Sequence, residues 1–180
     1  VAGVDEAGRG ALAGPVVAAA VILTDPWDWT PGCPVVDSKL LSPEEREAAF
    51  AVITACARAW AVGTAGPDEV DALGIARASR VAMVRAVTAL KVQPDYVLVD
   101  GPWPLGTGLP EMPLVQGEHR SVSVAAASVV AKVSRDRLMI RLDQEYPGYG
   151  FARHKGYPTD EHLRRLAELG PSPVHRRHYR

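Results

Sequence analysis

The sequence has few cysteines, no long apolar run and little net charge, and each shortage excludes a class of protein. Its two cysteines, Cys33 and Cys56, are not spaced as a metal-ligand pair, and we interpret them as unpaired thiols. Charged residues or prolines interrupt every apolar run before it could span a bilayer. The beginning of the chain also lacks the pattern of a secretory signal. We therefore expect a cytoplasmic protein without a membrane partner.

The net charge of −1 conceals an uneven distribution of charge. Residues 132–180 hold 11 Lys and Arg against 6 Asp and Glu, a balance of +5, whereas residues 1–131 hold 9 and 15, a balance of −6. A basic region of this kind is typical of a surface that contacts phosphates. Amphipathic helices with solvated basic faces would give the same count, so charge alone leaves both interpretations open.

The order of apolar runs and helix signals predicts an α/β protein that forms a single domain over residues 1–180. We expect a mixed sheet with helices on both faces, and loops at 25–36, 101–112 and 150–159. The expected strands are 1–5, 14–23, 60–65, 95–101 and 113–118. The expected helices are 42–58, 67–73, 75–90, 121–146 and 160–169. A capping box between Ser42 and Glu45 marks the start of the first helix.

Four acidic residues lie at the ends of expected strands, namely Asp5, Glu6, Asp100 and Glu118. Ligand sites in open α/β sheets commonly lie beyond the carboxyl ends of the strands, so we expect these residues to meet at one edge. Such a cluster would bind two Mg²⁺ or Mn²⁺ ions roughly 4 Å apart, which is the arrangement used for phosphodiester displacement. The alternative is that each acid is a solvated strand end, and for Glu118 alone that is the simpler interpretation.

Other motifs point to chemistry less directly. The Gly8-Arg9-Gly10 turn lets the backbone approach a ligand closely, but it lacks the further residues of a dinucleotide fingerprint or a P-loop. The five histidines do not form a zinc pattern with the cysteines. Ser128 has no obvious His and Asp partners, which argues against a nucleophilic serine. His154 and Lys155 beside Tyr157 form either an exposed phosphate and sugar site or simply a polar loop.

Five motifs occur together in the chain. They are Asp-Glu-Ala-Gly-Arg-Gly at 5–10, Asp-Ser-Lys at 37–39, Val-Asp-Gly at 99–101, Ala-Ala-Ala-Ser-Val-Val-Ala-Lys-Val-Ser-Arg-Asp at 125–136 and His-Lys-Gly-Tyr-Pro-Thr at 154–159. In this combination the chain resembles bacterial ribonuclease HII, a type 2 ribonuclease H, over almost its whole length. The resemblance implies a ribonuclease H-like fold, with a mixed five-stranded sheet flanked by helices. It also implies a helical C-terminal region, from about residue 137, that covers the substrate side.

The same resemblance implies an activity. The expected enzyme is a metal-dependent endonuclease that hydrolyses the RNA strand of RNA–DNA hybrids. It would also cleave 5′ to single ribonucleotides embedded in duplex DNA. Two Mg²⁺ or Mn²⁺ ions would take part in catalysis, and the products would carry 3′-hydroxyl and 5′-phosphate ends.

Residue roles follow from the matching motifs. Asp5, Glu6 and Asp100 would be catalytic metal ligands, with Glu118 at the fourth position. The motif at 8–10, formed by Gly8, Arg9 and Gly10, would surround the ribonucleotide and its 2′-hydroxyl, with Tyr157 against the sugar at the RNA–DNA junction. The remaining motif residues would contact phosphates or support the site: Ser38, Lys39, Ser128, Lys132, Arg135, His154 and Lys155.

One motif departs from the family pattern, because the family usually has an aspartate where this chain has Glu118 after Gly117. Glutamate keeps the charge but adds one methylene, which moves the ligating oxygen by roughly 1.5 Å, and active sites are sensitive to displacements of about 1 Å. We therefore expect the second metal site to be present with altered geometry.

Two other functions fit part of the sequence. Another two-metal nuclease or phosphotransferase of the same fold would leave the motif at 154–159 unexplained. A catalytically silent module that binds hybrids or duplexes conflicts with the acidic set, because carboxylates repel a phosphate backbone unless a metal intervenes. We expect a monomer whose partners are RNA–DNA hybrids and ribonucleotide-containing DNA duplexes. No clamp-binding peptide is evident, so recruitment by a sliding clamp is left open.

Overall fold

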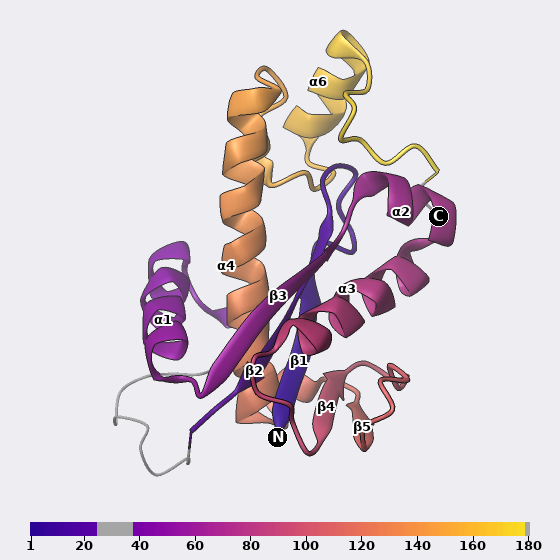
Figure 1. The fold of residues 1–180 in the computed structure, drawn as a ribbon. Helices are drawn as coiled ribbons and strands as arrows, with labels where there is room; N and C mark the ends of the chain where they lie inside the picture. The colour runs from indigo at the N-terminus through magenta and orange to yellow at the C-terminus, as the bar shows by residue number, and fades with distance from the viewer. Residues whose placement is uncertain (25–37, 179–180) are drawn as a thin grey trace.

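A five-stranded mixed sheet forms the centre of the described part of the chain, which comprises residues 1–24 and 38–178 of the computed structural model (Figure 1). Its strands are β1 (Ala2–Ala7), β2 (Val16–Ile22), β3 (Ala59–Ala65), β4 (Val97–Asp100) and β5 (Glu111–Leu114). They lie in the order β3-β2-β1-β4-β5. The pairs β3–β2 and β2–β1 are antiparallel, whereas β1–β4 and β4–β5 are parallel. The predicted mixed sheet is confirmed.

Helices cover both faces of this sheet. They are α1 (Pro43–Cys56), α2 (Pro67–Leu73), α3 (Ile75–Ala89), α4 (Val122–Glu145), α5 (Phe151–His154) and α6 (Asp160–Leu169), with short 3-10 helices η2 (Ser38–Leu40) and η3 (Gly117–His119). The long helix α4 packs on one face with α1 beside it, and α3 crosses the other face (Figure 1). The helix α6 lies near the C-terminal end of α4 (Figure 1). No helix in the described ranges is long and apolar enough to cross a membrane.

Small residues allow the helices to lie close to the sheet. Every residue of β2, whose sequence is Val-Val-Ala-Ala-Ala-Val-Ile, is buried. A Cβ atom added to Gly3 in β1 would overlap the backbone of Ser123 in α4. On the other face, a Cβ added to Gly63 in β3 would overlap the backbone of Ala82 in α3. The close contacts fix one helix layer against β1, which carries Asp5 and Glu6, and the other against β3.

The helix signals in the sequence are borne out. The Glu45 N–H donates to Ser42 Oγ at 3.1 Å, and the Ser42 N–H donates to Glu45 Oε2 at 2.7 Å, which completes the predicted capping box of α1. Thr159 caps α6 by accepting from the His162 N–H at 3.2 Å. Cys56, the last residue of α1, is a free and exposed thiol.

Two expectations about elements are wrong. The fifth strand was expected at 113–118, but β5 ends at Leu114, because Gln116 adopts a left-handed conformation with φ of 54° and turns the chain into η3. Glu118 therefore lies in a 3-10 helix and not at a strand end. The segment 150–159 was expected as a loop, but it contains α5, whose Phe151 is fully buried in a small apolar cluster at the end of α4. The expected loop at 25–36, together with Cys33 and Asp37, lies outside the described residues.

Candidate active site

Three carboxylates meet near the C-terminal ends of the neighbouring strands β1 and β4. Val4 of β1 is paired with Val99 of the parallel strand β4, so Asp5 and Asp100 follow on adjacent strands, with Glu6 next to them. One carboxylate oxygen from each of these acids lies within 4.8 Å of the others. Asp5, Glu6 and Asp100 thus meet, as predicted from their positions near strand ends. Glu118 does not belong to this group of three.

Glu118 reaches the site from η3 and lies beside Asp100. Its carboxyl group shares a hydrogen bond with that of Asp100, and Lys39 Nζ lies 3.6 Å from Glu118 Oε1. The Gly117 N–H donates to Asp100 Oδ1 at 2.7 Å, which fixes η3 against the end of β4. Asp100 therefore belongs to the cluster of three acids and links it to Glu118.

Burial raises the pKa values of all three clustered acids, and repulsion by neighbouring carboxylates adds to the shifts of Asp5 and Asp100. Burial, followed by the charges of Glu6 and Asp100, raises the pKa of Asp5 well above its usual value. Burial also raises the pKa of Glu6, although Arg9, whose Nη1 lies 3.4 Å from Glu6 Oε1, opposes the shift. Burial and the hydrogen bond with Glu118 raise the pKa of Asp100 to about 6. Without a further cation, full ionisation of this cluster is unfavourable.

Glu118 behaves differently from the other three acids. Burial acts to raise its pKa, but its own backbone N–H, the hydrogen bond with Asp100 and the charge of Lys39 together lower it. Glu118 is thus the acid of this site whose charged form the protein favours.

The donor set fits a hard divalent cation. Glu6 Oε2 and Glu118 Oε2 are buried and have no hydrogen-bond partner among the described residues. A buried carboxylate oxygen without a partner is costly unless a cation or an ordered water contacts it. Every group of the cluster offers oxygen, which is the donor that Mg²⁺ and Mn²⁺ prefer.

A cleft of about 350 Å³ opens beside the carboxylates. Most of the residues predicted from the motifs line it, namely Asp5, Glu6, Gly8, Arg9, Gly10, Ser38, Lys39, Asp100, Ser128, Lys132 and Tyr157, together with Ala7 and Arg46. These predicted substrate-reading residues and the acids Asp5, Glu6 and Asp100 therefore face one space, whereas Glu118 is not among the lining residues.

A buried arginine supports the glycine turn of this cleft. Arg135 of α4 is fully buried; its Nε donates to the Pro15 carbonyl at 2.9 Å, its Nη1 to that of Lys155 at 2.7 Å and its Nη2 to that of Ala13 at 3.0 Å. Gly8, with φ of 94°, passes so close that an added Cβ would overlap Arg135 Nε. Arg135 was expected to contact phosphate or support the site, and the structure assigns it to support.

A second buried arginine holds the same turn from the C-terminal segment. Arg176 donates to four carbonyls, those of Gly8 at 2.7 Å, Arg9 at 3.0 Å, Ala11 at 2.8 Å and Gly14 at 3.0 Å. Sequence reasoning missed this residue, because a basic tail is indistinguishable from a solvated one by composition.

Tyr157 forms the facing part of the cleft wall. Its ring lies under two cations, with Lys132 Nζ 5.5 Å and Arg135 Cζ 5.2 Å from the ring centroid. Lys132 is also paired with Asp136 at 2.9 Å. A Cβ added to Gly10 would lie 4.0 Å from Tyr157 Cε1, so the tyrosine ring and the glycine turn are neighbours.

A chain of buried hydrogen bonds ends on the Tyr157 backbone. His162 Nδ1 lies 2.9 Å from the Tyr157 carbonyl, His162 Nε2 lies 2.9 Å from His175 Nε2, and the Ser172 N–H donates to His175 Nδ1 at 2.9 Å. Because His175 Nδ1 accepts, His175 Nε2 carries the proton and donates to His162 Nε2, and His162 Nδ1–H donates to Tyr157. Burial lowers the pKa of both histidines, that of His175 to about 4, so the chain is neutral at pH 7.

Comparison with known proteins identifies the family. The model of the ribonuclease HII family matches residues 2–180. The chain belongs to the ribonuclease HII family. Ribonuclease HII of Geobacter metallireducens is 52% identical over 180 residues, which are 100% of this chain and 83% of that protein. Ribonuclease HII of Nitrosococcus oceani is 51% identical over 183 residues, covering 100% of this chain and 88% of the relative.

Solved structures agree with this assignment. Ribonuclease H2 from Pyrococcus horikoshii superposes with a TM-score of 0.81 at 29% identity, covering 98% of this chain and 92% of the other. Ribonuclease HII in the complex with PCNA from Archaeoglobus fulgidus gives 0.80 at 29% identity, with 97% and 91% covered. A Bst-RNase HIII structure with Mn²⁺ shares the fold at a TM-score of 0.70 and 20% identity, with 94% and 70% covered. The predicted fold and family are confirmed, and the protein is a ribonuclease H that hydrolyses the RNA of RNA–DNA hybrids.

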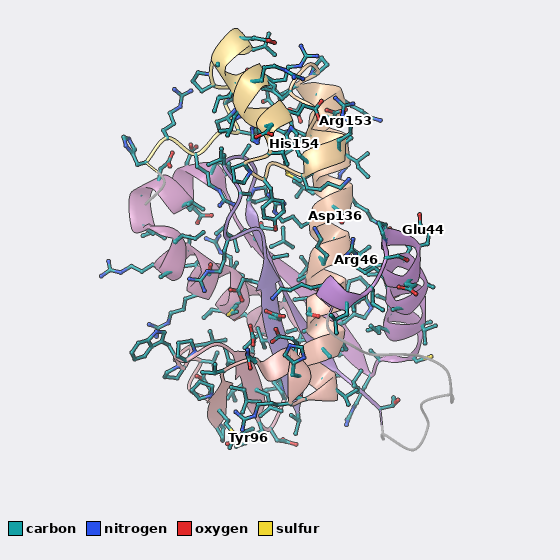
Figure 2. The ribbon with its side chains drawn as sticks, turned by 180° about the vertical axis from the view of Figure 1, so that it is seen from behind. Glu44, Arg46, Tyr96, Asp136, Arg153 and His154 are labelled. Atoms are coloured by element: carbon teal, nitrogen blue, oxygen red, sulfur yellow. The ribbon has the colours of Figure 1, made fainter. Side chains whose placement is uncertain are left out.

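Two residues of the last family motif do not fit a direct phosphate contact. His154 is buried between the end of α4 and α6 (Figure 2). The Gly156 N–H donates to its Nδ1 at 3.1 Å, and its Nε2 donates to the Tyr149 carbonyl at 2.7 Å. Lys155 Nζ donates to the Ala152 carbonyl, and Lys155 does not line the cleft. The interpretation of these residues as an exposed phosphate site is wrong, because the fold uses their polar atoms internally.

The serines of the other family motifs also act inside the protein. The Ser38 N–H donates to Ser128 Oγ at 3.3 Å, and Ser128 Oγ donates to the Ala125 carbonyl at 2.8 Å. Arg46, beside η2 and α4 in Figure 2, donates to the Ser38 carbonyl at 3.0 Å. These bonds fix η2 on α4 and present the exposed side chain of Lys39 at the mouth of the cleft. Arg46 is a further residue that sequence reasoning missed.

Proposed function

We propose that this ribonuclease H also cleaves 5′ to single ribonucleotides embedded in duplex DNA, and that its products carry 3′-hydroxyl and 5′-phosphate ends. The observation that carries the proposal is the shared cleft, in which the cluster of Asp5, Glu6 and Asp100 faces the same space as Gly8-Arg9-Gly10 and Tyr157. An enzyme that cleaves at a single ribonucleotide needs a carboxylate cluster for phosphodiester cleavage, and it needs residues beside that cluster that surround one sugar.

We also propose that two divalent cations, Mg²⁺ or Mn²⁺, are needed. Asp5, Glu6 and Asp100 would hold one ion, and Asp100 with Glu118 would hold the other. When bound, the ions would activate the attacking water and stabilise the leaving 3′-oxygen. The unpartnered oxygens Glu6 Oε2 and Glu118 Oε2 support this arrangement, as does the Mn²⁺ bound to the related Bst-RNase HIII.

The remaining residues would bind and orient the substrate. The backbone of Gly8 and Gly10 and the ring of Tyr157 would enclose the ribose and contact its 2′-hydroxyl, the group that distinguishes RNA from DNA. Lys39 and Lys132, both at the cleft, would contact the phosphates on either side. Ser38 and Ser128 would keep Lys39 in place through η2.

The test uses four substrates of one sequence: a DNA duplex, the same duplex with one ribonucleotide, the same duplex with four, and an RNA–DNA hybrid. We expect cleavage of all but the first in Mg²⁺ or Mn²⁺, none in chelator, and a 3′-hydroxyl on the nucleotide before the ribose. Cleavage of the all-DNA duplex at a similar rate would contradict the ribose specificity. Cleavage of the hybrid alone would contradict the single-ribonucleotide activity.

We also propose that the protein is a monomer and that a sliding clamp recruits it. In this proposal residues 1–180 act as one catalytic domain, whose C-terminal segments cover the substrate side. The PCNA complex of the Archaeoglobus fulgidus relative supports a clamp as a partner. Light scattering and co-elution with a bacterial sliding clamp test the two points separately.

A further inference from the structure

A second groove adjoins the catalytic carboxylates and is lined by α3 and by the loop that follows β4. Its volume is about 270 Å³. It shares Glu6, Arg9 and Asp100 with the cleft, and its other walls are the first turns of α3 and residues 101–105. Apart from Gly101, none of the groove residues on α3 or in that loop belongs to the motifs that indicated the family, so the proposed function leaves them without a role.

The groove contains a buried hydroxyl to which no described residue of the protein hydrogen-bonds. Ser79 of α3 is only 4% exposed, and its Oγ has no hydrogen-bond partner among the described residues. Buried polar groups are nearly always hydrogen-bonded, so an unpartnered one on a groove wall points to an occupant that supplies the partner. Because a hydroxyl donates as well as accepts, a phosphate oxygen would satisfy it.

Three arginines line the groove against the two carboxylates that it shares with the cleft, and the two arginines on α3 suit an anion. Arg77 and Arg80 lie on the exposed side of α3, and Arg9 lines the groove from the glycine turn. Arg80 Nε donates to the Leu105 carbonyl at 2.8 Å, which holds its guanidinium group at the groove. The planar guanidinium is the group best suited to phosphate recognition.

An exposed tryptophan stands at the rim on a loop that is held rigidly. Trp103 is 76% exposed. The Glu111 carboxylate accepts from the N–H groups of Leu105 at 2.7 Å, Gly106 at 3.1 Å and Thr107 at 2.7 Å, which fixes the segment after Trp103. An exposed aromatic ring beside arginines offers a flat apolar surface against which the sugar of a duplex nucleotide packs.

We infer that this groove binds the nucleotide of the cleaved strand next to the scissile phosphate, on the side away from Tyr157. Its phosphate would lie against Arg77, Arg80 and Ser79 Oγ, and its sugar would pack against Trp103. The volume is close to the lower end of the roughly 300–1,000 Å³ of ligand pockets, so it suits one nucleotide and not a longer segment. This inference rests on the proposed function, because it assumes that the substrate strand crosses the carboxylate cluster.

The test compares Arg77→Gln, Trp103→Ala and the control Arg58→Gln on a duplex with one central ribonucleotide. Arg58 is exposed and follows α1, on the opposite face of the sheet, so its substitution makes the same charge change away from the groove. We expect KM to rise about 3- to 10-fold for Arg77→Gln and about 5-fold or more for Trp103→Ala, with kcat unchanged. The salt dependence of log KM should fall by about one for Arg77→Gln, as for the loss of one phosphate contact. The control should behave as the unmodified protein.

Uncharged phosphates in the substrate locate the contact. A methylphosphonate at the phosphate of the deoxynucleotide 5′ to the ribonucleotide leaves the scissile phosphate intact and should abolish the difference in KM between Arg77→Gln and the unmodified protein. The same substitution two nucleotides 3′ to the ribonucleotide should preserve the difference. If KM for both groove variants stays within twofold of the unmodified value on the full duplex, or if the difference survives both substitutions, the inference is wrong.

Ser79→Ala separates binding from folding. Because the hydroxyl has no partner, its removal should leave the unfolding temperature unchanged or higher, while KM rises about 3-fold. A lower unfolding temperature with unchanged KM would show that the hydroxyl serves the fold. If the unmodified protein cleaves no ribonucleotide-containing duplex, the proposed function fails; fluorescence anisotropy of the same duplex then tests the groove alone, through a weaker affinity of Arg77→Gln than of Arg58→Gln.

Discussion

Gly8 and the buried Arg135 occupy adjoining space so closely that no side chain fits on residue 8. We expect Gly8→Ala to lower the free energy of unfolding by about 2 kcal/mol, because alanine disfavours a φ of 94° and its Cβ would displace the guanidinium group. Cleavage should fall with it. Urea unfolding and kinetics measure both effects.

Gly10→Ala provides the matched control, since a Cβ there would lie 4.0 Å from Tyr157 Cε1, in ordinary van der Waals contact. We expect unfolding to be unchanged. Equal destabilisation by the two substitutions would show that the contact with Arg135 is unimportant.

Arg176→Lys should destabilise the protein by about 3 kcal/mol, because lysine keeps the charge but cannot donate to the carbonyls of Gly8, Arg9, Ala11 and Gly14 together. Hydrogen exchange of the amides at 8–14 should increase. Arg177→Lys, at an exposed neighbour, is the control and should have no effect. Normal exchange of 8–14 in Arg176→Lys would contradict the prediction.

As the pH falls, the hydrogen bonds that hold the backbone of Tyr157 should break before the protein unfolds. The pKa of His175 is lowered to about 4 by burial and by His162, Arg177 and His154, from an ordinary value of 6.5. The unfolded state therefore binds more protons between these values, so the stabilisation is present above pH 6.5 and is lost as the pH falls toward 4. NMR of the histidine rings should report neutral tautomers at pH 7, with the proton on His175 Nε2 and on His162 Nδ1. A pKa of His175 near its ordinary value would contradict the hydrogen bonds that link His175 through His162 to Tyr157.

Asp100→Asn should stabilise the metal-free protein at pH 8 and abolish cleavage. The pKa of Asp100 is raised to about 6 from 3.8, so its stabilising contribution is complete below pH 3.8 and is lost as the pH rises through 6. Asparagine keeps an oxygen for the Gly117 N–H, and its amide donates to Glu118 without a charge. Thermal unfolding in chelator at pH 5 and 8 tests this, since the gain over the unmodified protein should be larger at pH 8. Mg²⁺ should raise the unfolding temperature of the unmodified protein alone.

Glu118→Asp should retain metal-dependent cleavage, whereas Glu118→Ala should lose most of it. Aspartate preserves the oxygen donors on a shorter side chain, and alanine removes the carboxylate that lies beside Asp100. Titration of activity with Mn²⁺ measures the change. Full activity of the alanine variant would remove Glu118 from the site.

The sequence predicts the parts of this molecule that local patterns determine. The hydrophobic period and the caps locate the helices. Asp5, Glu6 and Asp100 are found because they follow apolar runs of strand length, although Asp5 and Glu6 lie within β1 and only Asp100 ends its strand. Glu118 is placed in the wrong element, because the turn at Gln116 depends on a hydrogen bond from Gly117 to a distant carboxylate.

Residues that act over long sequence separations escape such reasoning. Arg176 bonds to carbonyls more than 160 positions away, and His154 looks like an exposed ligand until the packing of α5 and α6 buries it. In the groove, Ser79 is identified only because its hydroxyl lacks a hydrogen-bond partner among the described residues, and no sequence pattern predicts this.

The attachment of both cleft walls to the C-terminal segment also constrains how the enzyme is made. His175 reaches Tyr157 through His162, and the adjacent Arg176 holds the turn at 8–14. A nascent chain that has formed the sheet and assembled its carboxylates still lacks both supports until residue 176 has left the ribosome. The two walls of the proposed sugar pocket therefore gain these hydrogen bonds only when the C-terminal segment is present.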